Sequence, residues 1–285
     1  MKILHTVEEL RRWSRALRTE PHDDRAQMIG LVPTMGALHA GHASLIRAAA
    51  ARCDAIAVSI FVNPTQFGPN EDYARYPRTF EADCALAEAE GAAVIFAPTV
   101  EELYPATAST FVDVEGLSAR LDGASRPGHF RGVATVVAKL FIAAEADLAF
   151  FGQKDAAQVA VLRRMTSDLR LGTEIVVFPI VRESDGLALS SRNIYLSSKE
   201  RVQALALSRA VRDVEGLAAG GERRANVLIE AAQKIFAVEP GIRVDYLALV
   251  NWATLAPVEI ADPGTLFAAA AWVGPTRLID NTVLG

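Results

Sequence analysis

Short apolar runs alternate with longer amphipathic segments along most of the chain. Apolar runs bounded by polar or turn residues are typical of buried strands, and apolar residues at helical spacing are typical of helices. The pattern predicts strands at residues 28–32, 55–62, 93–96, 148–151 and 174–178, and helices at about 41–52, 80–90, 133–144 and 156–169. Because the two kinds of element alternate, we expect a parallel sheet covered by helices on both faces.

The two ends of the chain depart from this alternation. Thr6 and Glu9 have the spacing of a capping box, which predicts a lead-in helix ending near Leu17. Beyond about residue 181 the pattern predicts helices at 199–219 and 223–236, then strands at 244–250, 266–273 and 277–281. The expected fold is therefore α/β, with a Rossmann-like doubly wound parallel sheet in residues 1–180 and a smaller α+β domain in residues 181–285.

Charge and composition narrow the possible partners. The formal net charge is −5 and acidic and basic residues are mixed, so no basic stripe is available for nucleic acid or an anionic membrane. Charged residues interrupt the N-terminal stretch, so we expect no export signal, and residues 265–273 are too few to span a bilayer. Cys53 and Cys84 have no CxxC partner, which predicts buried reduced thiols and a cytoplasmic protein.

The segment after the first of the alternating strands carries the strongest sign of chemistry. His39, Gly41 and His42 stand where a helix is expected to begin. Glycine lets the backbone approach phosphate, a helix N-terminus offers N–H groups, and imidazoles donate hydrogen bonds to phosphate oxygens. We therefore expect this loop to bind a phosphate group.

Helix capping and zinc binding are the alternatives for this histidine pair. Capping alone can place two histidines three residues apart. A zinc site would need a third ligand, and the remaining histidines, His5, His22 and His129, have no metal-ligand spacing. The order of strand, motif and helix favours the phosphate interpretation.

Further runs give the chain a specific resemblance. The histidine motif is the signature of a superfamily of nucleotidyl-transferring α/β enzymes that includes the class I aminoacyl-tRNA synthetases. The whole sequence resembles the pantothenate synthetase family, AMP-forming ligases that join pantoate to β-alanine. The matching runs are residues 33–42, 59–67, 76–78, 126–133, 151–155 and 190–193, and the likeness continues from 244–246 to the end. Two departures are Ala40, where the family usually has glutamate, and Leu189, where it usually has methionine.

This resemblance implies an ATP site formed by three segments. The residues it assigns to ATP are Met35, Gly36, Ala37, Leu38, His39, Ala40, Gly41, His42, Gly152, Gln153, Lys154, Asp155, Val181, Leu189, Ser190, Ser191 and Arg192. The expected catalytic set within them is His39, His42, Lys154, Ser190, Ser191 and Arg192, placed to stabilise charge on the phosphates. Taken alone, a lysine in such a turn is more commonly a surface residue, and the serine pair with its arginine is equally explained as a polar hairpin loop between domains.

Amide side chains are the candidates for pantoate. The resemblance assigns Gln66 and Gln158 to this substrate, since amides can bind its hydroxyl and carboxylate oxygens without neutralising the nucleophile, and we include Asn63 with them. Ordinary capping by amides is the alternative. Residues 126, 129 and 131 form a local positive cluster that faces either substrate or a dimer contact.

The implied reaction has two steps. Pantoate attacks the α-phosphate of ATP to give pantoyl adenylate and pyrophosphate, and the amine of β-alanine then displaces AMP. Mg²⁺ is expected with ATP, with Asp72 or Asp83 as weak candidates for a protein ligand and no dedicated metal site. The resemblance also implies a homodimer, and the smaller domain is expected to act as a lid. A nucleotidyltransferase that keeps the nucleotide on its product and a non-catalytic nucleotide sensor are the rival functions.

Overall fold

The computed structural model describes residues 1–19, 27–69 and 71–285, so that His22 lies outside them. The chain divides into two compact units. Unit 1 comprises Met1–Gly152 and Val161–Phe178, and unit 2 comprises Gln153–Ala160 and Pro179–Gly285. Residues 153–160, which carry the lysine motif, therefore group with the C-terminal part of the chain and not with the sheet that precedes them.

Unit 1 contains a six-stranded sheet in which every neighbouring pair is parallel. The strand order is β1-β4-β3-β2-β5-β6. The strands are β1 (Lys2–Leu4), β2 (Ile29–Thr34), β3 (Ala55–Ile60), β4 (Val94–Phe96), β5 (Leu148–Gly152) and β6 (Glu174–Phe178). The predicted doubly wound α/β class is confirmed, as are all five predicted strands. Strand β1 was not predicted, because three residues are too few to show a pattern.

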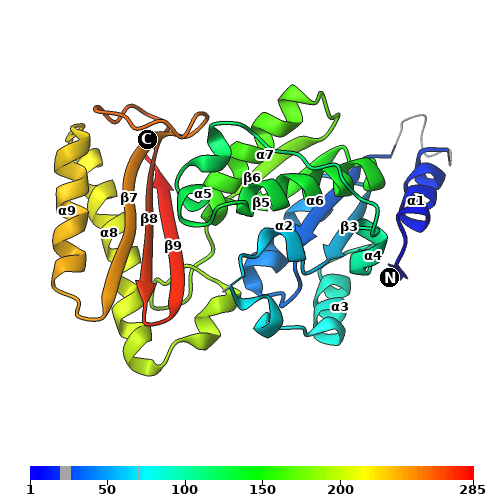
Figure 1. The fold of residues 1–285 in the computed structure, drawn as a ribbon, viewed down its shortest axis with the longest axis horizontal. Helices are drawn as coiled ribbons and strands as arrows, with labels where there is room; N and C mark the ends of the chain where they lie inside the picture. Colours follow the sequence, from blue (N-terminus) through cyan, green and yellow to red (C-terminus); the bar gives the residue numbers. More distant parts are fainter. Residues whose placement is uncertain (20–26, 70) are drawn as a thin grey trace. The chain divides into compact units, whose positions relative to one another are not determined.

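Helices cover this sheet on both faces. The longer ones are α1 (Val7–Thr19), α2 (Ala40–Ala50), α3 (Phe80–Ala89), α6 (His129–Ala144) and α7 (Ala156–Asp168), with short turns α4 (Val100–Leu103) and α5 (Asp122–Ser125) between them. Ile46 of α2 and Ala87 of α3 share one apolar core with Val32, Ile95 and Phe150 of the sheet. On the other side α6 contacts β2 and packs against α1. Figure 1 shows these elements along the chain.

The strand order reverses between two central neighbours, β2 and β5. From β2 the chain proceeds through β3 and β4 in one direction, and from β5 it proceeds to β6 in the other. Ligands of open α/β sheets bind at such a switch point, outside the carboxyl ends of the strands. The histidine loop follows β2 directly, and Gly152, the first residue of the lysine motif, ends β5.

Unit 2 is built on a three-stranded antiparallel sheet with the order β7-β8-β9. Its strands are β7 (Ile242–Asn251), β8 (Thr265–Val273) and β9 (Thr276–Val283), and its helices are α8 (Ser198–Ala219) and α9 (Ala225–Ala237). Figure 1 shows both helices along one face of this sheet. The alanine-rich run is the central strand β8, and small side chains allow α8 to approach it closely. The predicted α+β character is confirmed.

The structure also bears on membrane-spanning helices and on the two cysteines. Within the described part of the chain, no helix has both the length and the apolar character needed to cross a bilayer. Cys53 and Cys84 are free thiols, as predicted, but they are half-buried and not fully buried. Burial raises the pKa of the Cys53 thiol to about 11, so it is protonated at neutral pH.

Candidate active site

The histidine loop is held by a buried carboxylate. Gly36 and Ala37 have positive φ angles of 81° and 50°, which turn two successive N–H groups the same way. The N–H groups of Ala37 and Leu38 donate to Asp83 at 2.9 and 2.8 Å. Asp83 is only 2% exposed and also accepts a hydrogen bond from the Thr79 hydroxyl at 3.0 Å. Its carboxylate therefore fixes the loop, and these contacts do not favour a role as a Mg²⁺ ligand.

The two imidazoles cap helix α2 reciprocally. The Gly41 N–H donates to His39 Nδ1 at 3.1 Å, and the backbone N–H of His39 donates to His42 Nδ1 at 3.3 Å. The two rings are 4.1 Å apart between centroids. Because each Nδ1 accepts, the proton of the neutral ring belongs on Nε2. The two histidines therefore do cap the helix, as the capping alternative proposed. The capping contacts also set the tautomer, with the proton on Nε2, that an imidazole needs to donate to phosphate.

This arrangement changes which donors the loop offers. The sequence predicts that backbone N–H groups at the helix start bind phosphate. The N–H groups of Ala37, Leu38 and Gly41 are instead bonded within the protein. The imidazoles of His39 and His42, whose Nδ1 atoms take part in capping, remain the side-chain candidates of this loop for binding an anion.

The glutamine turn follows β3 and is organised by Asn63. The Asn63 amide donates to Gln66 Oε1 at 3.0 Å and to the Gly132 carbonyl at 3.1 Å, while its oxygen accepts from the Thr65 hydroxyl at 2.9 Å. Asn63 is 1% exposed, so its own access to a substrate is small. The Gln66 amide nitrogen lies 3.1 Å from Met35 Sδ, which brings the glutamine beside the histidine loop.

Helix α6 packs closely against the glutamine turn. A Cβ atom on Gly132 would lie 2.3 Å from the Thr65 carbonyl oxygen, so only glycine permits this approach. His129 Nδ1 donates to the Gln66 carbonyl at 2.8 Å, and Arg126 donates to His129 Nε2 at 2.9 Å. Since arginine can only donate, His129 is neutral.

The three residues of the predicted positive cluster, Arg126, His129 and Arg131, have different partners in the structure. Arg126 makes a two-point ion pair with Glu71 at 2.7 and 2.6 Å. Burial and the neighbouring Arg126 charge lower the pKa of His129 to about 4. Arg131 is separate from them and lies over the Phe111 ring, 3.9 Å from its centroid. Within unit 1, Arg126 and His129 therefore hold the glutamine turn.

The lysine loop belongs to unit 2 and is a short 3-10 turn, Gln153–Asp155. The Lys154 side chain is 20% exposed, and its Nζ lies 3.7 Å from Asp155 Oδ1. Asn281 on β9 donates to the carbonyl oxygens of Gln153 and Lys154 at 3.0 and 2.8 Å. Gln158 is half-buried in the first turns of α7.

The serine loop follows a short hairpin, residues 181–189, and does not itself form the turn of that hairpin. The Leu189 N–H donates to the Val181 carbonyl at 2.9 Å and closes the hairpin. Ser190 then caps the 3-10 turn Ser191–Tyr195 by accepting from the Arg192 N–H at 3.3 Å. The buried Asn193 ties this turn back to the hairpin through a 2.7 Å hydrogen bond to Glu183. The Ser190–Arg192 segment thus has a defined backbone.

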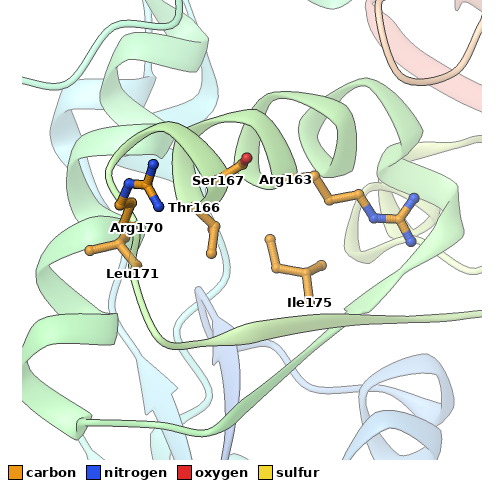
Figure 2. A pocket seen from close by; sticks show the side chains of 6 residues that line it. All are labelled: Arg163, Thr166, Ser167, Arg170, Leu171 and Ile175. Carbon is orange, nitrogen blue, oxygen red and sulfur yellow. The ribbon is translucent and has the colours of Figure 1, made fainter.

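Among the residues that the structure describes, no three His, Cys, Asp or Glu side chains gather as a metal site, so no third ligand from this part of the chain joins His39 and His42. A separate cavity of about 430 Å³ lies near the end of α7, as Figure 2 shows. It is lined by Arg163, Thr166, Ser167, Arg170, Leu171 and Ile175, none of which the sequence assigned to substrate.

The residues that hold the loops were not predicted from the sequence. Asp83 lies in a predicted helix and was considered only as a ligand of Mg²⁺, not as a residue that holds the histidine loop. Asn281 carried a usable signal, because Asp280 and Asn281 are consecutive polar residues in a strand that the structure buries. Buried polar side chains need partners, so such a pair indicates a structural or functional contact.

A parallel doubly wound sheet with two helix-capping imidazoles at its switch point is the arrangement of a nucleotide-binding α/β enzyme. The comparison with known families is more specific. The family model described as Pantoate-beta-alanine ligase matches residues 2–283, and this chain belongs to that family.

Individual relatives match this chain along nearly their whole length. Pantothenate synthetase from Acidobacterium capsulatum is 59% identical over 100% of this chain and 97% of that protein. The crystal structure of pantothenate synthetase from Thermus thermophilus matches with a TM-score of 0.92 and 45% identity, over 99% of both chains. Pantoate-beta-alanine ligase from Francisella tularensis, complexed with beta-gamma ATP and beta-alanine, has a TM-score of 0.78 and 32% identity, over 99% of this chain and 97% of that one. The predicted family and enzyme class are confirmed.

Proposed function

We propose that this chain condenses pantoate with β-alanine while ATP is cleaved to AMP and pyrophosphate. The observation that carries the proposal is the His39–His42 capping pair, which fixes the orientation of two imidazoles at the switch point of a family-matched sheet. The Francisella tularensis relative, complexed with beta-gamma ATP and beta-alanine, supports the choice of two of the three substrates.

In the first step a carboxylate oxygen of pantoate attacks the α-phosphorus of ATP. A new P–O bond forms as the bond to pyrophosphate breaks, and negative charge builds on the phosphate oxygens. We assign the stabilisation of this charge to His39, His42 and Lys154, and to the serine loop with Ser190, Ser191 and Arg192. Preorganised donors lower such a barrier because they need no reorientation as charge develops.

In the second step the amine of β-alanine attacks the acyl carbon of pantoyl adenylate. The C–O bond to AMP breaks, the amide bond forms, and the neutral amine loses one proton while its other hydrogen stays as the amide N–H. No covalent bond to the protein is required. Positioning of the two substrates is therefore the chief contribution of the chain to this step.

Pantoate recognition is assigned to Gln66 and Gln158. Gln66 is 9% exposed and is oriented by Asn63, so a substrate oxygen would meet an amide that is already in place. We therefore assign Asn63 an indirect role, in which it positions Gln66. An amide pair can bind hydroxyl and carboxylate oxygens without forming an ion pair with the nucleophile.

Mg²⁺ is part of the proposal as a companion of ATP. Asp83, one of its two candidate protein ligands, is bonded to backbone N–H groups of the histidine loop. When bound to the phosphates, Mg²⁺ would withdraw charge from them. A homodimer and a lid role for the part of the chain after residue 180 are further elements of the proposal, supported by the family resemblance.

Product analysis tests the proposed function. Incubation with ATP, pantoate and β-alanine should give pantothenate, AMP and pyrophosphate in equal amounts. A product that retains the nucleotide would indicate a nucleotidyltransferase, and ATP binding without turnover would indicate a sensor. Either result would overturn the proposal.

A further inference from the structure

Two neighbouring residues of β9 hold the lysine loop and the hairpin that precedes the serine loop. Asn281 is bonded to the lysine loop, and Asp280 is bonded to Arg182 at the start of the hairpin that leads to the serine loop. Successive side chains of a strand point to opposite faces, so adjacent positions can hold two different segments. Strand β9 also packs against both 3-10 turns.

The bonds from Asn281 match the needs of the lysine turn. Its side-chain nitrogen Nδ2 donates to the backbone carbonyl oxygens of Gln153 at 3.0 Å and Lys154 at 2.8 Å. Its side-chain oxygen Oδ1 accepts from Gln153 Nε2 at 3.3 Å. Two carbonyl oxygens demand a donor with two hydrogens, which asparagine has and aspartate lacks. Asn281 is 4% exposed, so water cannot readily replace it.

Asp280 forms a two-point ion pair with Arg182. Asp280 is 1% exposed, and Arg182 donates to its two oxygens at 2.6 and 2.9 Å. The same carboxylate accepts the Asn281 N–H at 2.8 Å, which links the two contacts. Arg182 follows Val181 and its hairpin closes through Leu189, directly before Ser190.

We propose that Asn281 is a positioning residue for Lys154, and that the Asp280–Asn281 pair sets the geometry of both nucleotide loops of unit 2. A fixed carbonyl direction at residues 153 and 154 limits where the lysine side chain can begin. An ammonium held near its working position stabilises charge better than one that must be ordered during the reaction. The catalytic part of this inference rests on the proposed function, whereas the holding of the loop does not.

The kinetic test separates the two half-reactions. Asn281→Ala should slow adenylate formation from ATP by about 10- to 100-fold, because a displaced charged group loses that order of rate. Turnover of supplied pantoyl adenylate should stay within a few-fold of the unchanged protein. In a Lys154→Ala background the Asn281 change should add little, since its effect acts through the lysine.

Two further variants guard against a general structural effect. Asn281→Asp keeps the size of the side chain but removes the donor, so it should be at least as slow as Asn281→Ala. Thr282→Val, an isosteric change at the next position of β9, should leave both half-reactions unchanged. Normal adenylation by Asn281→Asp, or equal slowing of both half-reactions by Asn281→Ala, would overturn the inference.

Hydrogen exchange tests the same contact without activity. Amides of residues 153–156 should exchange at least tenfold faster in Asn281→Ala or Asn281→Asp than in the unchanged protein, with Thr282→Val unaltered. Unchanged exchange in this segment would refute the inference even if the enzyme is active. If the unchanged protein makes no pantothenate, the proposed function fails, and faster exchange would still support the role of Asn281 in holding the loop.

Discussion

The histidine loop of unit 1 and the lysine loop of unit 2 are both held by one buried polar side chain, but with opposite hydrogen-bond sense. Asp83 accepts the N–H groups of two successive residues at 2.9 and 2.8 Å. Asn281 donates to the carbonyl groups of two successive residues at 3.0 and 2.8 Å. One loop has its donors engaged, and the other has its acceptors engaged.

Under the proposed function, this difference determines which groups we expect each loop to offer to phosphate. With two of its backbone N–H groups bonded to Asp83, the histidine loop would bind phosphate through its imidazoles. In the lysine loop the bonded carbonyl oxygens are less free to repel a phosphate, and the ammonium supplies the positive charge. A neutral amide suits this second task, because a carboxylate at Asn281 would face two carbonyl oxygens.

The largest effect is expected at His42. His42→Ala should reduce adenylate formation by about 100- to 1000-fold, the usual cost of losing a preorganised donor to developing charge. It should also remove half of the capping box and about 1 kcal/mol of stability. His42→Gln is the matched control, since glutamine retains the capping contact and lacks the imidazole. Rapid-quench measurement of pyrophosphate should find both variants slow, and a rate within a few-fold of the unchanged protein would remove His42 from catalysis.

A pH effect is expected from unit 1, where His129 is one of the residues that hold the glutamine turn. His129 has a pKa of about 4 when folded, below its ordinary value. Its neutral form is therefore favoured in the folded protein, and its stabilising effect is lost as the pH falls below about 6.5 towards 4. By pH 5 this loss should reach about 2 kcal/mol.

Denaturant unfolding between pH 7 and 5 measures this loss. The His129→Gln variant should be less stable at pH 7, but its stability should fall less steeply with acid. An identical pH slope in the two proteins would mean that His129 is not held neutral beside Arg126.

An isosteric change at Asp83 tests whether it holds its loop as an acceptor, in contrast to Asn281, which donates. Asp83→Asn replaces one acceptor oxygen by an amide nitrogen and should cost about 1 to 3 kcal/mol of stability, because a buried N–H loses its partner. Adenylation should slow with it, while the Mg²⁺ concentration needed for half-maximal rate should not change. A raised Mg²⁺ requirement with unaltered stability would instead support Asp83 as a metal ligand.

A smaller and more selective effect is expected for pantoate. Gln158→Ala should lower kcat/KM for pantoate by about 10- to 100-fold, since an unpaired substrate oxygen in a closed site costs about 1 to 3 kcal/mol. ATP affinity measured alone by calorimetry should change little. Weak ATP binding with normal pantoate kinetics would place Gln158 in the nucleotide site.

The sequence predicted much of the fold because the elements of the sheet follow simple patterns. The strands at β2 and β5 are continuous apolar runs, and His39 and His42 stand out at a strand–helix junction. It did not predict the holding residues, because Asp83 lies 46 residues from Ala37 and Asn281 lies 128 residues from Gln153. Contacts over such separations depend on the tertiary fold, and no local periodicity reports them.

The same limit applies to the boundary between the units. Residues 153–160 follow β5 directly, and chain order assigns them to the first domain. The Asn281 bonds and the Trp252 indole, which donates to the Ala156 carbonyl at 2.9 Å, instead tie them to unit 2. These partners are distant in sequence, so the pattern of strands and helices could not reveal them.

The central claim is that the histidine and lysine loops serve the first half-reaction, in which the triphosphate is broken. The most direct measurement supplies synthetic pantoyl adenylate and β-alanine to Lys154→Ala and compares this rate with the rate from ATP and pantoate. The account predicts a severe loss from ATP and a rate within a few-fold of the unchanged protein from the adenylate. Equal slowing from both starting points would contradict it.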